Sequence, residues 1–259
     1  MKKILLASLM LLGLVSCDDF LTKDPLTSFQ DDDFWCNENN VRGFAMGYYA
    51  ARFPGYGSGD SGGTMSQRQA LNDDFTNTSL SGFAAAPIVK GGSWGSHLSN
   101  IRRDNIFIDR VERVTEWNEE TANHWRGIAR FFRGYDYATF ASIYKNVPYY
   151  DHELTIDSDD LFRKQDDVFY VMDKVLEDYE FASKNVLVSD TKTGPDGQVI
   201  TQGVVDAFMS RDMLLMGTKL KYDPATTTEQ MEHVAKYLQA AKDAAWRVIS
   251  SNRYSCLLY

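Results

Sequence analysis

The segment from Trp125 to Asp151 reads WRGIARFFRGYDYATFASIYKNVPYYD and decides the fold class. Apolar side chains recur in it at steps of three and four residues, which places them on one face of a helix. Phe131 and Tyr137 lie off this stripe, so we expect the helix to contact neighbours on more than one side. Pro148 should end the helix, because proline lacks an N–H and restricts the residue before it. The residues of the stripe are Trp125, Ile128, Phe132, Tyr135, Thr139 and Ile143.

The same periodicity predicts further helices along the rest of the chain. Asn118 is a candidate N-cap for the helix described above, and Thr226 and Glu229 have the spacing of a capping box. The last two helices should face each other, because small alanines on the final stripe allow close approach of two backbones. We therefore predict an all-α stack with long irregular loops and little or no β-sheet. The further helices are expected at about residues 29–53, 95–114, 166–186, 201–222 and 229–250.

Composition limits the classes of partner. The chain has 259 residues and a formal net charge of −9, which argues against nucleic-acid binding because phosphate contacts need an excess of lysine and arginine. Its three cysteines form neither a disulfide framework nor a metal-binding spacing, and we expect Cys36 and Cys256 to be free thiols. The acidic run at 157–160 lacks the glycine and glutamate of a calcium-binding EF-hand loop. No metal and no cofactor are predicted.

The N-terminus has the features of a lipoprotein signal. Lys2 and Lys3 precede an apolar run at 4–15 that is too short to span a bilayer, which needs about 20 residues. Leu14-Val15-Ser16-Cys17 then has the form of a bacterial lipobox. We predict a signal peptide at 1–16, a lipid on Cys17 and a tether at 17–28, with the folded domain occupying 29–259. Acyl chains add roughly 0.8 kcal/mol of membrane affinity per buried methylene, so this anchor would be durable.

Three stretches of the chain resemble one family of proteins. The sequence ARFFRGYDY followed by YKNVP resembles a motif of the SusD/RagB-like outer-membrane lipoproteins, although Ile128, Gly134 and Lys145 depart from the family pattern. SWGSHLSNIRRDNIFIDRVERV at 93–114 and DDVFYVMDKVLEDYEFA at 166–182 are similar to two further family stretches. The resemblance covers nearly every predicted helix and implies a tetratricopeptide-like superhelix. Family members are longer, so the C-terminal portion of the family pattern is expected to be absent.

The resemblance also implies a function. Such proteins are surface-exposed nutrient-binding partners of SusC-like TonB-dependent transporters in Bacteroidetes. We therefore expect a protein anchored to the outer membrane and facing the exterior, which binds an oligosaccharide and hands it to the transporter without making or breaking a bond. The residues leave open whether the nutrient is a glycan or a peptide.

Sugar binding needs an aromatic face for the pyranose ring and polar side chains for its hydroxyls. Trp94 is the first candidate, because it lies in a glycine-rich loop before a helix and matches a family tryptophan. It could equally be a core aromatic at the start of that helix. Arg130 and Arg133 should instead be structural, with their charges held by acidic residues of the next helix. The remaining candidates for ligand binding are Tyr56, Phe83, Asn100 and Arg102.

Two alternative functions have a basis in the sequence. Residues 91–95 spell G-x-S-x-G, the nucleophile elbow of serine hydrolases, with Ser93 in the nucleophile position. That chemistry also needs a parallel sheet and an acid placed before the histidine, which the pattern does not supply. GDSGG at 59–63 resembles a protease motif, but every histidine follows the serine. A helical-repeat scaffold that binds protein alone is the second alternative.

Overall fold

The computed structural model describes residues 34–53, 93–115, 117–189 and 199–255. Helices account for nearly all regular structure in these ranges, where the only β-pairing is an isolated bridge between Val147 and Asp166. The prediction of an all-α fold is confirmed. None of the helices described is long and apolar enough to cross a membrane. The helices are α4 (Glu38–Arg52), α6 (Trp94–Val111), α7 (Glu119–Tyr144), α8 (Val168–Asn185), α9 (Gln202–Lys221) and α10 (Met231–Ser250).

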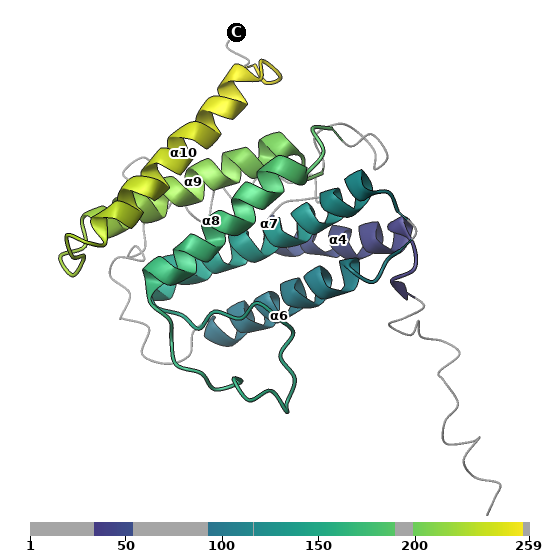
Figure 1. Cartoon of the computed structure of the whole chain (residues 1–259), viewed down its shortest axis with the longest axis horizontal. Coiled ribbons are helices and arrows are strands. Elements are labelled where there is room, and N and C mark those ends of the chain that lie inside the picture. Colours follow the sequence, from purple (N-terminus) through teal and green to yellow (C-terminus); the bar gives the residue numbers. More distant parts are fainter. Residues whose placement is uncertain (1–33, 54–92, 116, 190–198, 256–259) are drawn as a thin grey trace, which may run out of the picture.

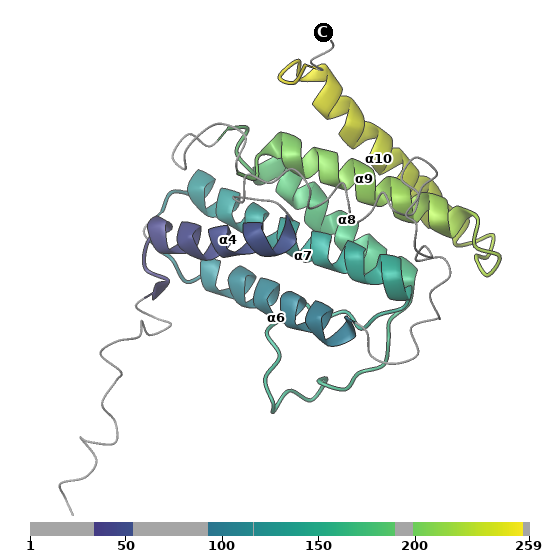
Figure 2. The same ribbon diagram turned by 180° about the vertical axis from the view of Figure 1, so that it is seen from behind.

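From α6 onward, successive helices lie side by side and form a stack (Figure 1). Helix α7 is central: it packs against α6 on one side and α8 on the other, and α10 packs mainly on α9 at the far edge of the stack. Figure 2, which shows the opposite side, places α4 over α6 and α7. The long connection between α7 and α8 passes beside α6, on the side away from α7 (Figure 1).

One predicted helix start and one predicted capping box are wrong, for local reasons. The first helix does not run unbroken from residue 29, because Asn37 caps α4 by accepting a hydrogen bond from the Asn40 amide at 3.1 Å. The capping box of the last helix lies one residue later than predicted: Thr227 and Gln230 exchange the reciprocal bonds. The Thr226 hydroxyl instead donates to the carbonyl of Leu220 in the preceding helix.

The ends of α7 agree with the sequence patterns. The Asn118 side chain accepts a hydrogen bond from the Thr121 amide at 2.8 Å, so its predicted N-cap role is confirmed. The helix ends at Tyr144, and Lys145 turns the chain with a φ of 67° in the left-handed region. The chain then enters the Asn146–Pro148 segment, where the Asn146 side chain accepts from the amide of Val168 and so helps to start α8.

Half of the stripe predicted on α7 is buried, namely Trp125, Ile128 and Phe132, and the helix uses more than one face. Phe132 stacks on Tyr48 of α4 with ring centroids 4.4 Å apart, and Phe131 contacts Tyr179 of α8. Neither phenylalanine has any exposed surface. Tyr135 and Thr139 are partly buried, and Ile143, near the helix end, departs furthest from the prediction with 48% of its surface exposed.

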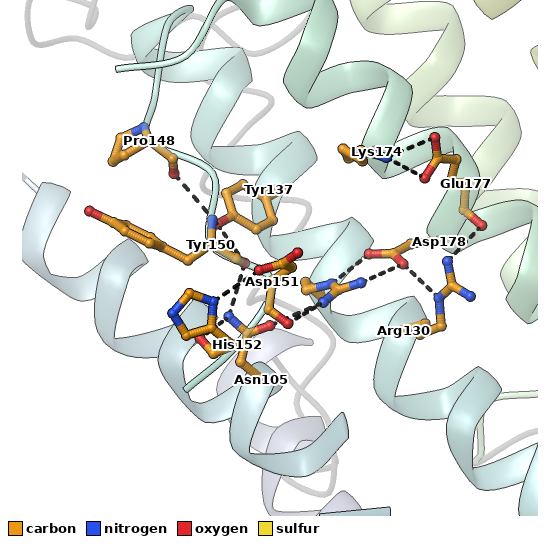
Figure 3. Close-up of polar contacts among 11 residues, drawn as sticks. Asn105, Arg130, Tyr137, Pro148, Tyr150, Asp151, His152, Lys174, Glu177 and Asp178 are labelled. Atoms are coloured by element: carbon orange, nitrogen blue, oxygen red, sulfur yellow. Dashed lines mark hydrogen bonds and ion pairs between the residues drawn. The ribbon is translucent and has the colours of Figure 1, made fainter. Parts of the chain in front are cut away.

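A buried polar network joins α7 to α8 and to the segment after Pro148 (Figure 3). Asp178 of α8 accepts hydrogen bonds from Arg130 at 2.7 Å and from Arg133 at 2.7 and 2.9 Å. The predicted structural role of these two arginines is confirmed. Asn105 of α6 donates to the carbonyl of Tyr150 at 2.9 Å, so the same region also fixes the loop that follows α7.

The helices α9 and α10 approach closely at a small residue. A methyl group at Gly217 would lie 2.8 Å from Leu238 Cδ2 and 3.5 Å from the Leu238 backbone nitrogen, so the Leu238 side chain would have to shift to admit it. On α10, Val234, Tyr237 and Ala241 are buried against this contact. The predicted pairing of the last two helices is confirmed.

Candidate functional site

Helix α6 contributes residues to two pockets of similar size. One has a volume of about 430 Å³ and lies between α6 and the loop after α7; we call it the aliphatic pocket. The other, of about 400 Å³, lies between α4, α6, α7 and α9; we call it the aromatic pocket. The aliphatic pocket is lined by Leu98, Ser99, Ile101, Arg102, Asn105, Tyr150, His152, Leu154, Thr155, Ile156 and Leu161. The aromatic pocket is lined by Ala51, Arg52, Phe53, His97, Asn100, Tyr135, Asp136, Thr139, Phe208 and Arg211.

The polar groups of the aliphatic pocket are largely occupied by its own walls. Arg102 donates to the carbonyl of Leu154 at 2.9 Å and to the Glu153 carboxylate at 2.7 Å. The Asn105 amide donates to the carbonyls of Tyr150 and His152 at 2.9 and 3.0 Å. A ligand in this pocket would therefore meet mainly apolar surface with few donors to spare.

The aromatic pocket combines ring surface with side chains that can still form hydrogen bonds. Phe208 lies 5.6 Å, centroid to centroid, from both Phe53 and Tyr135, so rings from three segments converge. Asn100 reaches the pocket from α6, and its side chain forms no hydrogen bond with the described part of the chain. Aromatic faces beside polar side chains are the combination that binds a pyranose ring and reads its hydroxyls.

Three buried charged residues, Arg52, Asp136 and Asp104, lie together at the aromatic pocket. Arg52 of α4 donates twice to one oxygen of Asp136, at 2.9 and 2.7 Å, and lies 3.8 Å from Asp104 of α6. Burial raises the pKa of Asp104 well above its usual range, and the neighbouring Asp136 carboxylate raises it further. Burial also raises the pKa of Asp136, although Arg52 opposes that shift. The two carboxyl groups therefore resist carrying two negative charges together.

Comparison with known proteins decides the family. The family model described as starch-binding and associating with the outer membrane matches residues 64–254. The chain belongs to the SusD-like family. A SusD-like protein of Formosa agariphila is 26% identical over 183 residues, covering 67% of this chain and 35% of that protein.

Solved structures of SusD-like proteins share the fold. One from Bacteroides fragilis, 17% identical, has a TM-score of 0.59 and covers 90% of this chain and 42% of its own. One from Parabacteroides distasonis, 18% identical, has a TM-score of 0.51 and covers 63% of this chain and 32% of its own. The chain thus spans well under half the length of these SusD-like relatives.

The structure separates the ligand-binding candidates of this SusD-like chain. Asn100 lines the aromatic pocket, whereas Arg102 lines the aliphatic pocket on the other side of α6. Trp94 lines neither pocket; its half-buried ring packs edge-on against Phe140 and Tyr144 at 4.7 and 5.0 Å. Tyr56 and Phe83 lie outside the described residues, as do Cys17 and Cys256. Cys36 is exposed and forms no disulfide within the described ranges.

Sequence reasoning missed the residues that α9 and the end of α4 bring to the aromatic pocket. Phe53 is far from Phe208 and Arg211 in the sequence, and it meets them only because α9 packs beside α7. The three-residue spacing of Phe208 and Arg211 placed them on one face of a helix. No pattern in the sequence indicated which helix that face would meet.

Ser93 forms one contact that a serine hydrolase would need. Its hydroxyl lies 3.1 Å from Nε2 of His97, one turn later in the chain, and burial lowers the pKa of that histidine. A triad also needs an acid on Nδ1, and this buried atom has no hydrogen-bond partner among the described residues. The described ranges also contain no parallel sheet to hold a nucleophile elbow. Within these ranges, no cluster of three potential metal ligands occurs either.

The buried carboxyl group of Asp104 gives a pH prediction. Its raised pKa means that the folded state keeps a proton which the unfolded state releases above about pH 4. The stability that this retained proton gives the folded state therefore falls as pH rises from about 4 through the folded-state pKa of Asp104. Asp104→Asn keeps a neutral group of similar shape at every pH. We therefore expect the free energy of unfolding of the variant, minus that of the wild type, to be larger at pH 8 than at pH 5. Urea denaturation at both pH values measures the difference, and an equal difference at both would contradict the prediction.

Proposed function

We propose that this SusD-like chain binds a nutrient glycan in the aromatic pocket and hands it to a SusC-like TonB-dependent transporter. The observation that carries the binding proposal is the convergence of Phe53, Tyr135 and Phe208 beside polar side chains that remain available to a ligand. The family's description as starch-binding supports a saccharide ligand. Binding and release would involve no bond chemistry, so no enzymatic activity is proposed.

The place of action belongs to the same proposal. The family's association with the outer membrane supports a location on that membrane. The lipobox at 14–17 would supply the anchor through a lipid on Cys17, and residues 17–28 would hold the helical domain away from the bilayer on its exterior face. The helical stack would offer the transporter a broad surface, as the family resemblance implies.

Asn100 and Arg102 give a matched pair of variants for testing the pocket. They lie on the same helix, but only Asn100 faces the aromatic pocket. We expect Asn100→Ala to weaken glycan binding about five- to thirtyfold, because one or two hydrogen bonds of roughly 1 kcal/mol each are lost. Arg102→Ala should leave the affinity unchanged, since its guanidinium binds Leu154 and Glu153 in the loop after α7.

The measurement is calorimetric titration of the full chain with a panel of neutral and acidic oligosaccharides. Loss of binding in the Arg102 variant but not in the Asn100 variant would mean that the glycan binds in the aliphatic pocket instead. If no saccharide in the panel binds the wild-type chain, the glycan proposal fails. Trp94→Ala in the same titration tests whether that indole takes part, which stays a prediction.

A further inference from the structure

Arg211 is held at the edge of the aromatic pocket in a conformation suited to an anion. Its guanidinium carbon lies 4.3 Å from the centroid of the Phe208 ring and 5.8 Å from that of Tyr135. Its Nε donates to Asp212 at 2.7 Å, and the other Asp212 oxygen is held by the Tyr179 hydroxyl at 2.6 Å. The Arg211 guanidinium is thus held by the Phe208 ring face and by the bond from its Nε to Asp212.

The two terminal nitrogens of Arg211 are left available. Its side chain is 49% exposed, and within the described residues neither terminal nitrogen donates a hydrogen bond. Arg52, the other arginine of the pocket, differs because its Nε and one terminal nitrogen are taken by Asp136. Of these two cations, Arg211 is the one able to offer a pair of parallel donors to a ligand.

A planar pair of N–H donors matches the two oxygens of a carboxylate and also the oxygens of a sulfate ester. We propose that the aromatic pocket selects an anionic saccharide, with Arg211 binding the charged group while the rings contact the sugar. This inference rests on the proposed glycan-binding function and adds the chemical class of the ligand. The chain as a whole carries a net charge of −9, so selection comes from this one arginine rather than from a long-range positive field.

Ligands that differ only in charge test the proposal. The full chain is titrated with oligogalacturonate and oligoalginate, each beside its carboxyl-reduced neutral form, and with a sulfated galactan oligosaccharide beside its desulfated form. We expect at least one anionic form to bind roughly tenfold or more tightly than its neutral partner, since hydrogen bonds to charged groups contribute about 1.5–3 kcal/mol. The pair that shows the preference distinguishes a carboxylate from a sulfate ester.

Variants assign the preference to Arg211. Arg211→Gln should remove the preference, so that the anionic and neutral forms bind with similar affinity. Arg102→Gln, in the aliphatic pocket, is the matched control and should change neither affinity; circular dichroism checks that both variants are folded. Equal binding of anionic and neutral partners, or a preference that survives Arg211→Gln, overturns the anionic class while the glycan-binding function stands. Absence of all saccharide binding overturns the proposed function itself.

Discussion

Replacing Asp178 with alanine is expected to lower the free energy of unfolding by about 3–5 kcal/mol, because removing one partner of a buried ion pair leaves the other charge uncompensated. Asp178 is almost fully buried and holds both Arg130 and Arg133. Arg130 keeps about a quarter of its side chain exposed and can turn to water, whereas Arg133 cannot without opening the contact between α7 and α8. The cost therefore falls mainly on Arg133.

A double replacement separates lost charge balance from lost packing. Arg133→Met with Asp178→Leu removes both buried charges and fills similar space, so most of the stability should return. Some loss should remain, because Arg133 also donates to Asn105 and to the carbonyl of Asp151. Urea denaturation of the single and double variants gives the comparison. If the double variant is no more stable than Asp178→Ala, the electrostatic explanation is wrong.

Replacing Phe132 with alanine should also cost about 3–5 kcal/mol, the range for truncating a phenylalanine in a packed core. The Phe132 ring has no exposed surface and contacts rings from α4, including the stacked ring of Tyr48. Alanine would leave a cavity where α4 and α7 meet. The thermal and urea midpoints of the variant should both fall.

Ile143→Ala is the matched control, because Ile143 belongs to the same predicted stripe of α7. About half of its surface is exposed, so the replacement should change the free energy of unfolding by less than about 1 kcal/mol. Similar losses for the two variants would mean that the end of α7 is more deeply packed than the structure shows.

This pair of residues marks how far the sequence could predict the fold. The spacing of apolar residues in 125–143 identified the helix and its buried face, since that spacing is a local property of a helix. The burial of its last turn depends on which segment covers it, and periodicity carries no information about that. The N-cap at Asn37 and the Thr227–Gln230 pair before α10 were missed for a related reason: several polar residues lie nearby, and only the folded backbone selects which of them form these hydrogen bonds.

The candidate site was less predictable than the fold. Asn100 was named from its sequence, but its pocket forms only where α9 brings Phe208 and Arg211 beside α7. Contacts between residues more than one hundred positions apart cannot be read from local patterns in a single sequence. Closeness in the sequence can also mislead. Arg102 is only two residues from Asn100 along the chain, yet it faces a different pocket.

The position of α10 has a consequence for how the molecule opens. Because this helix packs mainly on α9, its detachment would leave the interior between α6, α7 and α8 nearly intact. A layered arrangement of this kind has no single unfolding event that must break every contact at once. Backbone amides of α10 should therefore exchange with deuterium sooner than those of α7, and the outermost layer can adapt its shape without loosening the pocket.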